Sequence, residues 1–399
     1  MSGVTKHISD HEIRCIISMW SRQIETIKPI LPYEYGKEEI IALLKEFYPH
    51  EWQSVEYKYL YYKKKDEYIK KHTGRTRHNM PSASKLLDRV PLFQKIITDR
   101  YRSSWHIDFS LDMQELERQA LYTKRNPKID KVNKKIAIAK AKTQQVTPAF
   151  IGKLIGLYER KNTSQKDRLY ILFELKKYYN PTVINFFFKL NDTELNQQLR
   201  ELAFQHLQSF NYEPRARKQK YMSVHTKNIK RRQYLKKVYP YETYKIPEMP
   251  QELEYRINNS KDQLIKEYDY FISHSSKDGI SVQSLIVAEN QQKKNVFCDW
   301  ISDVDYLKRH LVCEATLKVI ERRLEQSKAL IFVESENSRN SIWCKYELNY
   351  FRGLGKQIFV VTKSDIDTGV FELKPMKDNW YLDANYKKIA LFESASVQA

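Results

Sequence analysis

Glycine is scarce in this sequence. The 399 residues include only nine glycines, about a third of what ordinary usage of ~7% would supply. Neither GxGxxG nor GxxxxGK[ST] occurs, and these are the two common glycine-rich loops that hold nucleotide phosphates against the start of a helix. The sequence therefore argues against a nucleotide site of either type.

Cysteine and long apolar runs are also rare. The four cysteines, at positions 15, 298, 313 and 344, form no CxxC pair and no local Cys/His cluster. We therefore expect no structural metal site and reduced thiols, as in an intracellular protein. No run of about 18 apolar residues occurs, and the amino terminus lacks the apolar core of a signal peptide. We expect a cytoplasmic protein with no membrane partner.

The excess of positive over negative charge lies entirely before residue 266. The chain has 69 Lys and Arg against 49 Asp and Glu, a net charge of +20, yet residues 266–399 hold 19 of each sign. Such a change indicates parts with different roles. We divide the chain into a basic helical region (1–160), a helical region with a basic linker (161–245) and an α/β domain (266–399).

The α/β domain alternates short apolar runs with amphipathic segments. The runs are β-prone, and the segments between them carry apolar residues at helical spacing. This alternation predicts right-handed crossovers and a parallel sheet that is covered on both faces by helices. We expect strands over residues 268–273, 295–300, 329–333, 357–361 and 379–382.

Polar segments follow the first three of these strands. They span residues 274–278, 299–309 and 335–341, and ligands of such sheets bind beyond the carboxyl ends of the strands. Asn340 or Ser341 is expected to cap the next helix. On that helix Trp343 and Glu347 are four residues apart, so they share one face. A carboxylate beside an indole at this edge is a candidate reactive centre.

Three ordered motifs carry a resemblance to a known family. They are DYFISHSSKD at 269–278, VFCD at 296–299 and SENSRNSIWCKYEL at 335–348. Together they resemble a bacterial Toll/interleukin-1 receptor (TIR) domain over about residues 266–395. The resemblance implies a flavodoxin-like, parallel, five-stranded domain at the carboxy terminus, behind a mostly α-helical domain.

The resemblance also implies a reaction. Many bacterial TIR domains cleave NAD at the nicotinamide–ribose bond with the glutamate of a Trp-x-x-x-Glu helix, which implies a catalytic Glu347 with Trp343 as the motif tryptophan. Loss of nicotinamide leaves an oxocarbenium-like ribose, which a fixed carboxylate can stabilise. NAD is then the substrate, and no cofactor or metal is required. We expect an NAD+ nucleosidase, either a glycohydrolase or an ADP-ribose cyclase.

Other positions are candidate NAD contacts. Ser273, His274 and Ser275 end the first strand, where related enzymes contact substrate phosphate or ribose, often through an arginine that this chain lacks. Asp299 is expected at the end of the second strand, where it would act either as a substrate contact or as a structural hydrogen-bond partner. The alternative for each is an ordinary polar residue at a strand end.

Residues 302–310 match the loop through which TIR domains stack on one another. In several relatives this loop completes the pocket of a neighbouring domain. Lys308 and Arg309 are expected to do so here, or else to be solvated. Self-association through TIR domains is therefore an expected interaction.

Residues 1–265 are expected to be mostly helical. A helix is expected to begin at Asp10, and residues 164–208 predict three short helices that resemble one or two HEAT-like repeats or a generic bundle. The positive excess, interleaved with tyrosines, would attract nucleic acid. An acidic protein partner or plain solvation would also fit.

These observations favour an NAD-cleaving TIR effector of bacterial antiphage defence. The helical part would hold the TIR domain off until a trigger brings TIR domains together. Two alternatives remain open at this point. One is a non-enzymatic TIR adaptor, and the other is a nucleic-acid-binding regulator.

Overall fold

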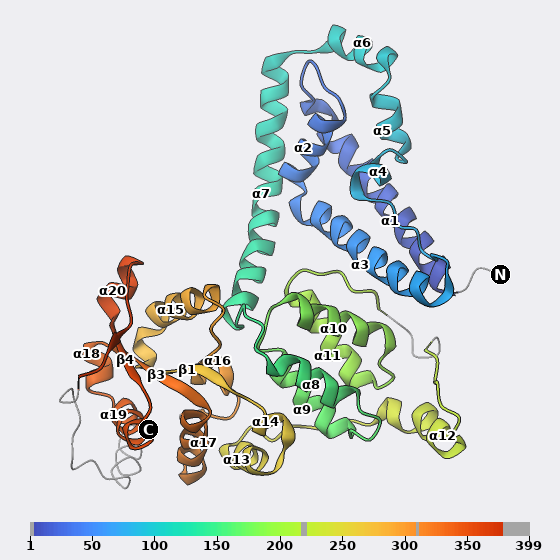
Figure 1. Cartoon of the computed structure of the whole chain (residues 1–399). Helices are drawn as coiled ribbons and strands as arrows, with labels where there is room; N and C mark the ends of the chain where they lie inside the picture. The colour runs from blue at the N-terminus through green and yellow to red at the C-terminus, as the bar shows by residue number, and fades with distance from the viewer. Residues whose placement is uncertain (1–3, 217–221, 309–310, 378–399) are drawn as a thin grey trace. The chain divides into compact units, whose positions relative to one another are not determined.

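The computed structural model describes residues 4–216, 222–308 and 311–377 (Figure 1). The chain divides into two compact units. Unit 1 comprises residues 1–137 with 211–213, and unit 2 comprises residues 138–210 with 214–399. The predicted division at residues 160, 245 and 266 stays a prediction.

Unit 1 is helical and encloses its own core. The stacked rings of Trp20 and Trp52, 5.3 Å apart, lie inside it and are buried. The first helix begins at Val4, so Asp10 lies within this helix, and the expectation that Asp10 caps it is wrong. The helices that form the unit are α1 (Val4–Ile27), α2 (Lys37–Phe47), α3 (Pro49–Thr73), α4 (Ala83–Leu87), α5 (Pro91–Ile96), α6 (Asp99–Asp108) and most of α7 (Leu111–Ala141).

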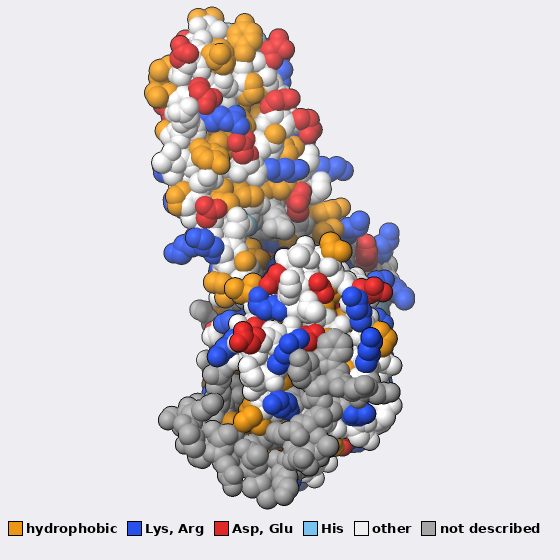
Figure 2. Space-filling view, turned by 90° about the vertical axis from the view of Figure 1, so that its left-hand side faces the viewer, with side chains coloured by type: hydrophobic (Ala, Val, Ile, Leu, Met, Phe, Trp, Pro, Cys, Tyr) orange, Lys and Arg blue, Asp and Glu red, His pale blue; other side chains and the backbone are white. Residues whose placement is uncertain are grey.

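The surface of unit 1 mixes side chains of every kind. In the upper part of Figure 2, Lys and Arg side chains are interspersed with Asp, Glu and apolar ones. Leu111, Met113 and Leu116, near the start of α7, are all more than half exposed. No helix in the described part of the chain is long and apolar enough to span a bilayer.

Unit 2 begins with helices that confirm the expected helical character. Asn180 accepts a hydrogen bond from the Val183 amide and caps α10, which begins at Pro181 as expected. Asn196 caps α11 in the same way, through the Leu199 amide. The resemblance to HEAT-like repeats stays a prediction. These helices are α8 (Phe150–Glu159), α9 (Gln165–Leu175), α10 (Pro181–Thr193), α11 (Gln197–Ser209), α12 (Ile229–Lys237), α13 (Pro250–Asn259) and α14 (Lys261–Leu264).

A five-stranded sheet follows, and it confirms the α/β prediction. Its order is β2-β1-β3-β4-β5, which is the flavodoxin-like order. The first four strands are parallel, and β5 runs antiparallel to β4. The strand expected at 379–382 lies outside the described residues. The strands are β1 (Tyr268–Ser273), β2 (Val296–Phe297), β3 (Ser327–Glu334), β4 (Ile358–Thr362) and β5 (Lys374–Pro375).

Helices cover both faces of this sheet (Figure 1). Side chains of β3 alternate between the faces, with Leu330 and Phe332 in one apolar cluster and Ile331 and Val333 in the other. The first cluster packs against α17 (Glu314–Glu325) and α19 (Ile342–Gly353), and the second against α15 (Gly279–Gln291) and α20 (Lys363–Thr368). Two short helices, α16 (Asp299–Ser302) and α18 (Glu336–Arg339), follow β2 and β3.

The β2 edge of the sheet is covered by a side chain from the helical segment. The Gln144 Nε2 atom donates to the Val296 carbonyl at 2.6 Å, and the Val296 amide donates to Gln144 Oε1 at 3.0 Å. Gln144 is buried. Its side-chain amide therefore satisfies the backbone of an edge strand that would otherwise be open to another chain.

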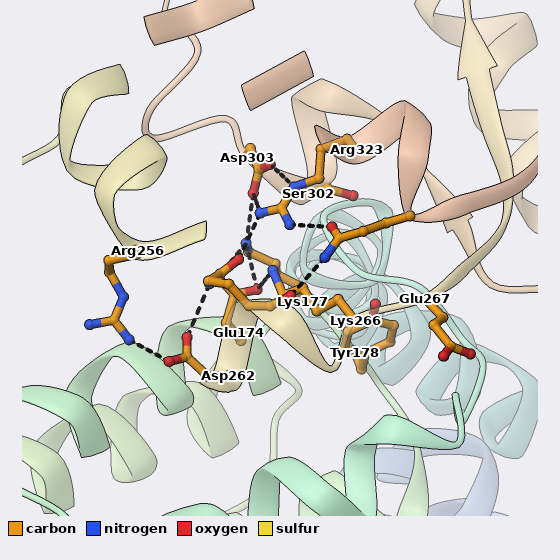
Figure 3. Close-up of polar contacts among 12 residues, drawn as sticks. Glu174, Lys177, Tyr178, Arg256, Asp262, Lys266, Glu267, Ser302, Asp303 and Arg323 are labelled. Carbon is orange, nitrogen blue, oxygen red and sulfur yellow. Dashed lines mark hydrogen bonds and ion pairs between the residues drawn. The ribbon is translucent and has the colours of Figure 1, made fainter. Parts of the chain in front are cut away.

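A buried charge cluster joins the helical segment to the sheet domain (Figure 3). Its members are two carboxylates and three cations, Glu174, Lys177, Lys266, Asp303 and Arg323. Asp303 accepts from Arg323 Nε at 2.8 Å and lies 3.3 Å from Lys177 Nζ. Glu174 pairs with Lys177 at 2.9 Å and with Lys266 at 2.5 Å. The cluster thus links α9 to α17 and to the residue that follows α16.

Removing one cation from this cluster should destabilise the protein. Arg323→Met leaves the buried carboxylate of Asp303 without its main partner, which costs about 3–5 kcal/mol. The neighbouring Arg322→Met is a matched control, because Arg322 pairs with Glu325 on the surface, where such pairs contribute about 0–1 kcal/mol. Chemical denaturation of both variants tests this, and equal effects would contradict it.

Candidate active site

Glu347 lies at the carboxyl edge of the sheet on α19. Ser341 caps this helix as expected, because its Oγ accepts from the Cys344 amide at 3.3 Å; Asn340 instead ends α18. The helix starts at Ile342, so Trp343 and Glu347 stand one turn apart on one face. Both side chains are partly buried.

Glu347 is held by the end of the first strand. Ser273 Oγ donates to Glu347 Oε2 at 2.6 Å, and Ser273 is fully buried. Ser273 pairs with Phe332 of β3 in the sheet register. The strand order reverses between β1 and β3, which is where ligands bind in sheets of this type. The hydrogen bond therefore fixes a carboxylate at the expected ligand-binding edge.

The environment of Glu347 favours its neutral form. Burial, together with the charge of Asp299, outweighs the opposing hydrogen bond from Ser273, and the pKa of Glu347 rises from its ordinary value of 4.5 to about 8. Burial also raises the pKa of the neighbouring Cys344 thiol to about 12, with a contribution from Glu347. A carboxyl whose pKa lies near neutrality is typical of functional sites.

A buried aspartate ties together the loops around this site. Asp278 accepts from Ser335 Oγ at 2.6 Å and from Asn337 Nδ2 at 2.8 Å. These contacts join the segment after β1 to the segment after β3. Asp278 was not among the predicted site residues. The polar segments at 274–278 and 335–341 were the signal in the sequence that could have indicated its role.

The other predicted residues lie at the same edge, just after β1 and β2, because β1 ends at Ser273 and β2 already ends at Phe297. His274 Nε2 is 3.8 Å from Asp299 Oδ1, so the structure brings these two residues together. Ser275 caps the short helix at 276–278 through the Lys277 amide. Asp299 begins α16, and its side chain is 55% exposed. Cys298, which the sequence analysis did not select, lies beside both His274 and Asp299.

Lys308 of the predicted stacking loop makes a contact of its own, apart from those above. Lys308 Nζ pairs with Glu248 Oε2 at 2.5 Å, in the segment that precedes α13. Arg309 lies outside the described residues.

Trp343 packs against the apolar pair of Leu317 and Tyr346 as well as the sheet cluster. The role of Lys308, Arg309 and Trp343 in NAD binding stays a prediction.

The sheet order and the Ser273–Glu347 edge define a TIR-like domain. Residues 271–366 match the family described as "Thoeris protein ThsB, TIR-like domain". The comparison confirms the resemblance that the motifs indicated. Comparison with solved structures gives no significant match.

The relatives extend the similarity to the helical part. The chain is 34% identical over 366 residues to a Cytobacillus dafuensis protein named "Putative cyclic ADP-D-ribose synthase TIR2", and the match covers 92% of this chain and 93% of that protein. The chain therefore belongs to the same bacterial TIR protein family.

Two other relatives match the TIR part of the chain. A Bacillus cereus protein named "Probable 3' cyclic ADP-D-ribose synthase ThsB'" is 36% identical over 104 residues, which is 26% of this chain and 53% of that protein. Toll-like receptor 2 of Bos indicus is 35% identical over 83 residues, which is 21% of this chain and 10% of the receptor.

The raised pKa of Glu347 predicts a pH-dependent stability. The folded chain keeps this proton up to a pH of about 8, whereas the unfolded chain releases it near 4.5. The stabilisation is therefore complete below 4.5 and is lost as the pH rises through 8. Thermal unfolding across this range should show wild type losing stability relative to Glu347→Gln. A parallel pH dependence of the two proteins would contradict the assignment. The control is Glu336→Gln, which replaces an exposed carboxylate on α18 and should follow the pH dependence of wild type.

Proposed function

We propose that this protein cleaves NAD at the nicotinamide–ribose bond and closes the remaining ADP-ribose into a cyclic product. The observation that carries the proposal is the Ser273–Glu347 hydrogen bond at the β1/β3 edge of a TIR-like sheet. The product is supported by the relative that spans nearly the whole chain, since it is named a cyclic ADP-D-ribose synthase. Hydrolysis to linear ADP-ribose is the alternative outcome of the same bond cleavage.

The carboxylate of Glu347 would act on charge that develops on the sugar. As the bond to nicotinamide breaks, positive charge appears on the ribose. A carboxylate fixed in a site of low dielectric stabilises this charge without reorganising. Ser273 holds one carboxylate oxygen and thereby orients the other. The intermediate then reacts with a nucleophile of the same molecule to give a ring, or with water to give ADP-ribose.

The raised pKa of Glu347 is compatible with this role. In the free protein Glu347 is largely protonated at neutral pH, because its pKa is about 8. Nicotinamide in NAD carries a positive charge, and an opposite charge within a few ångströms lowers the pKa of a carboxyl. Substrate binding therefore generates the carboxylate that the reaction needs.

Replacing Glu347 should abolish NAD turnover. Glu347→Gln removes the charge but keeps the shape and the contact with Ser273, so turnover should fall at least about a hundredfold, as for loss of other charge-stabilising groups. The matched control is Glu336→Gln, which removes an exposed carboxylate from α18 and should keep wild-type turnover. Chromatography of the products also separates cyclic from linear ADP-ribose.

The result for Glu347→Gln also separates the enzyme from the non-enzymatic adaptor. Wild-type turnover in this variant, with its thermal unfolding intact, would contradict the assigned site. Absence of turnover in the wild-type protein under every activating condition would favour the adaptor.

We further propose that activity depends on assembly in the cytoplasm, as part of antiphage defence. The family match to a Thoeris protein supports the defence role. The 50 basic against 30 acidic side chains in residues 1–265 support nucleic acid as a trigger. An acidic protein would be attracted by the same charge.

Assembly predicts that turnover per molecule depends on concentration. Because association of TIR domains would select the active state, specific NAD turnover should rise with protein concentration, and a triggering nucleic acid should raise it at low concentration. Added salt should weaken the nucleic-acid effect. A specific turnover that stays constant over a hundredfold range of concentration, with and without nucleic acid, would contradict this model.

A further inference from the structure

Three side chains with metal-binding atoms meet beside Glu347. The His274 Nε2 atom lies 3.9 Å from Cys298 Sγ and 3.8 Å from Asp299 Oδ1, and the Cys298 and Asp299 atoms are 4.0 Å apart. The three atoms therefore form a nearly equilateral triangle. They come from the loop after β1 and from the junction of β2 with α16.

The size of this triangle fits a transition-metal ion. Zinc bonds of ~2.3 Å to sulfur and ~2.0–2.1 Å to nitrogen and oxygen place tetrahedral ligand atoms about 3.3–3.6 Å apart. The observed separations exceed these values by a few tenths of an ångström, so small side-chain rotations would close the shell. Imidazole, thiolate and carboxylate together form a common zinc ligand set.

The histidine already has the orientation that metal binding requires. His274 Nδ1 lies 3.1 Å from the Ile272 carbonyl, so this nitrogen carries the proton and donates it. The lone pair of Nε2 then faces Cys298 and Asp299. Metal-binding histidines usually donate their second ring N–H to a backbone carbonyl or a carboxylate in this way.

The exposure of the three side chains shows from which side a metal ion could reach the cluster. Cys298 is 1% exposed, and the His274 side chain is 6% exposed. The Asp299 side chain is 55% exposed and faces solvent. An ion would enter past this carboxylate and keep one coordination position for water or another ligand, as in zinc sites with three protein ligands.

We propose that His274, Cys298 and Asp299 form a site for a divalent transition-metal ion such as Zn²⁺, and that its occupation inhibits NAD cleavage. On binding, sulfur exchanges its proton for a bond to the metal, and the proton passes to solvent. The inhibition rests on the proposed function. His274 directly follows Ser273, which holds Glu347, so the bound ion would lie beside the proposed catalytic carboxylate. A bound dication at this edge would repel the positive nicotinamide ring and the developing ribose cation.

Zinc binding tests the site without any reference to catalysis. The chelator-treated full chain is titrated with Zn²⁺ against a chromophoric chelator, with no NAD present. Wild type should bind one equivalent, and Cys298→Ser and Asp299→Asn should each weaken binding at least tenfold. Cys313→Ser is the matched control, since this partly exposed thiol lies outside the cluster, and it should bind zinc like wild type.

Two results would overturn the metal site. One is the same zinc affinity in wild type, Cys298→Ser and Asp299→Asn, and the other is no bound equivalent in wild type. Circular dichroism establishes that each variant is folded. Asp299→Asn keeps the test decisive if the buried Cys298→Ser does not fold, because Asp299 is exposed.

NAD turnover then tests inhibition separately. One equivalent of Zn²⁺ should lower wild-type and Cys313→Ser turnover at least tenfold, and excess chelator should restore it. Turnover of Cys298→Ser, compared with its own metal-free rate, should resist the same zinc concentration. Zinc that binds wild type without changing turnover would overturn the inhibitory role. Absence of turnover in metal-free wild type under every activating condition would instead count against the proposed function and leave the binding result standing.

Discussion

Asp303 pairs with Arg323 inside the α/β domain and with Lys177 of the preceding helical segment, and it thereby anchors the domain to that segment. The Asp303 and Arg323 side chains are fully buried, and a buried charge is tolerated only with a charged partner and hydrogen bonds. Lys177 from the helical segment completes the shell of Asp303. Because Asp303 directly follows α16, the same contacts fix the short helix that carries Asp299. The geometry of the candidate site thus depends on charges that lie outside it.

Two glutamates in unit 2 illustrate how partners decide the role of a buried carboxyl. Burial favours the neutral form of Glu174, yet the charges of Lys177 and Lys266 outweigh it and lower its pKa to about 2. The hydrogen bond that Glu347 accepts from the Ser273 hydroxyl does not outweigh the effect of burial, and the pKa of Glu347 rises to about 8. The first carboxylate is therefore charged at neutral pH and holds its two lysine partners. The second can change its charge near neutral pH, a property that is typical of functional sites.

Local patterns predicted much of the sheet domain, whereas contacts between distant segments had no signal in the sequence. The apolar runs located β1 and β4, and the polar residues before the Trp-x-x-x-Glu helix narrowed its cap to Asn340 or Ser341, because each feature depends on neighbouring residues. Gln144 and Val296 lie 152 residues apart, so no local pattern links them. Arg323 would be expected in solvent on an amphipathic helix, but α17 turns it toward Asp303. His274 and Cys298 form no local pair because they are 24 residues apart.

Asp299 connects the two proposals through one electrostatic effect. Its negative charge helps to raise the pKa of Glu347, so any cation placed beside it favours the carboxylate form of Glu347. The nicotinamide ring of NAD would supply that charge together with the sugar on which the carboxylate acts. A metal ion on Asp299 would supply the charge without the sugar, and it would occupy the edge that the substrate must approach. Asp299 would therefore favour catalysis when the cation beside it is the nicotinamide ring and inhibition when it is a metal ion.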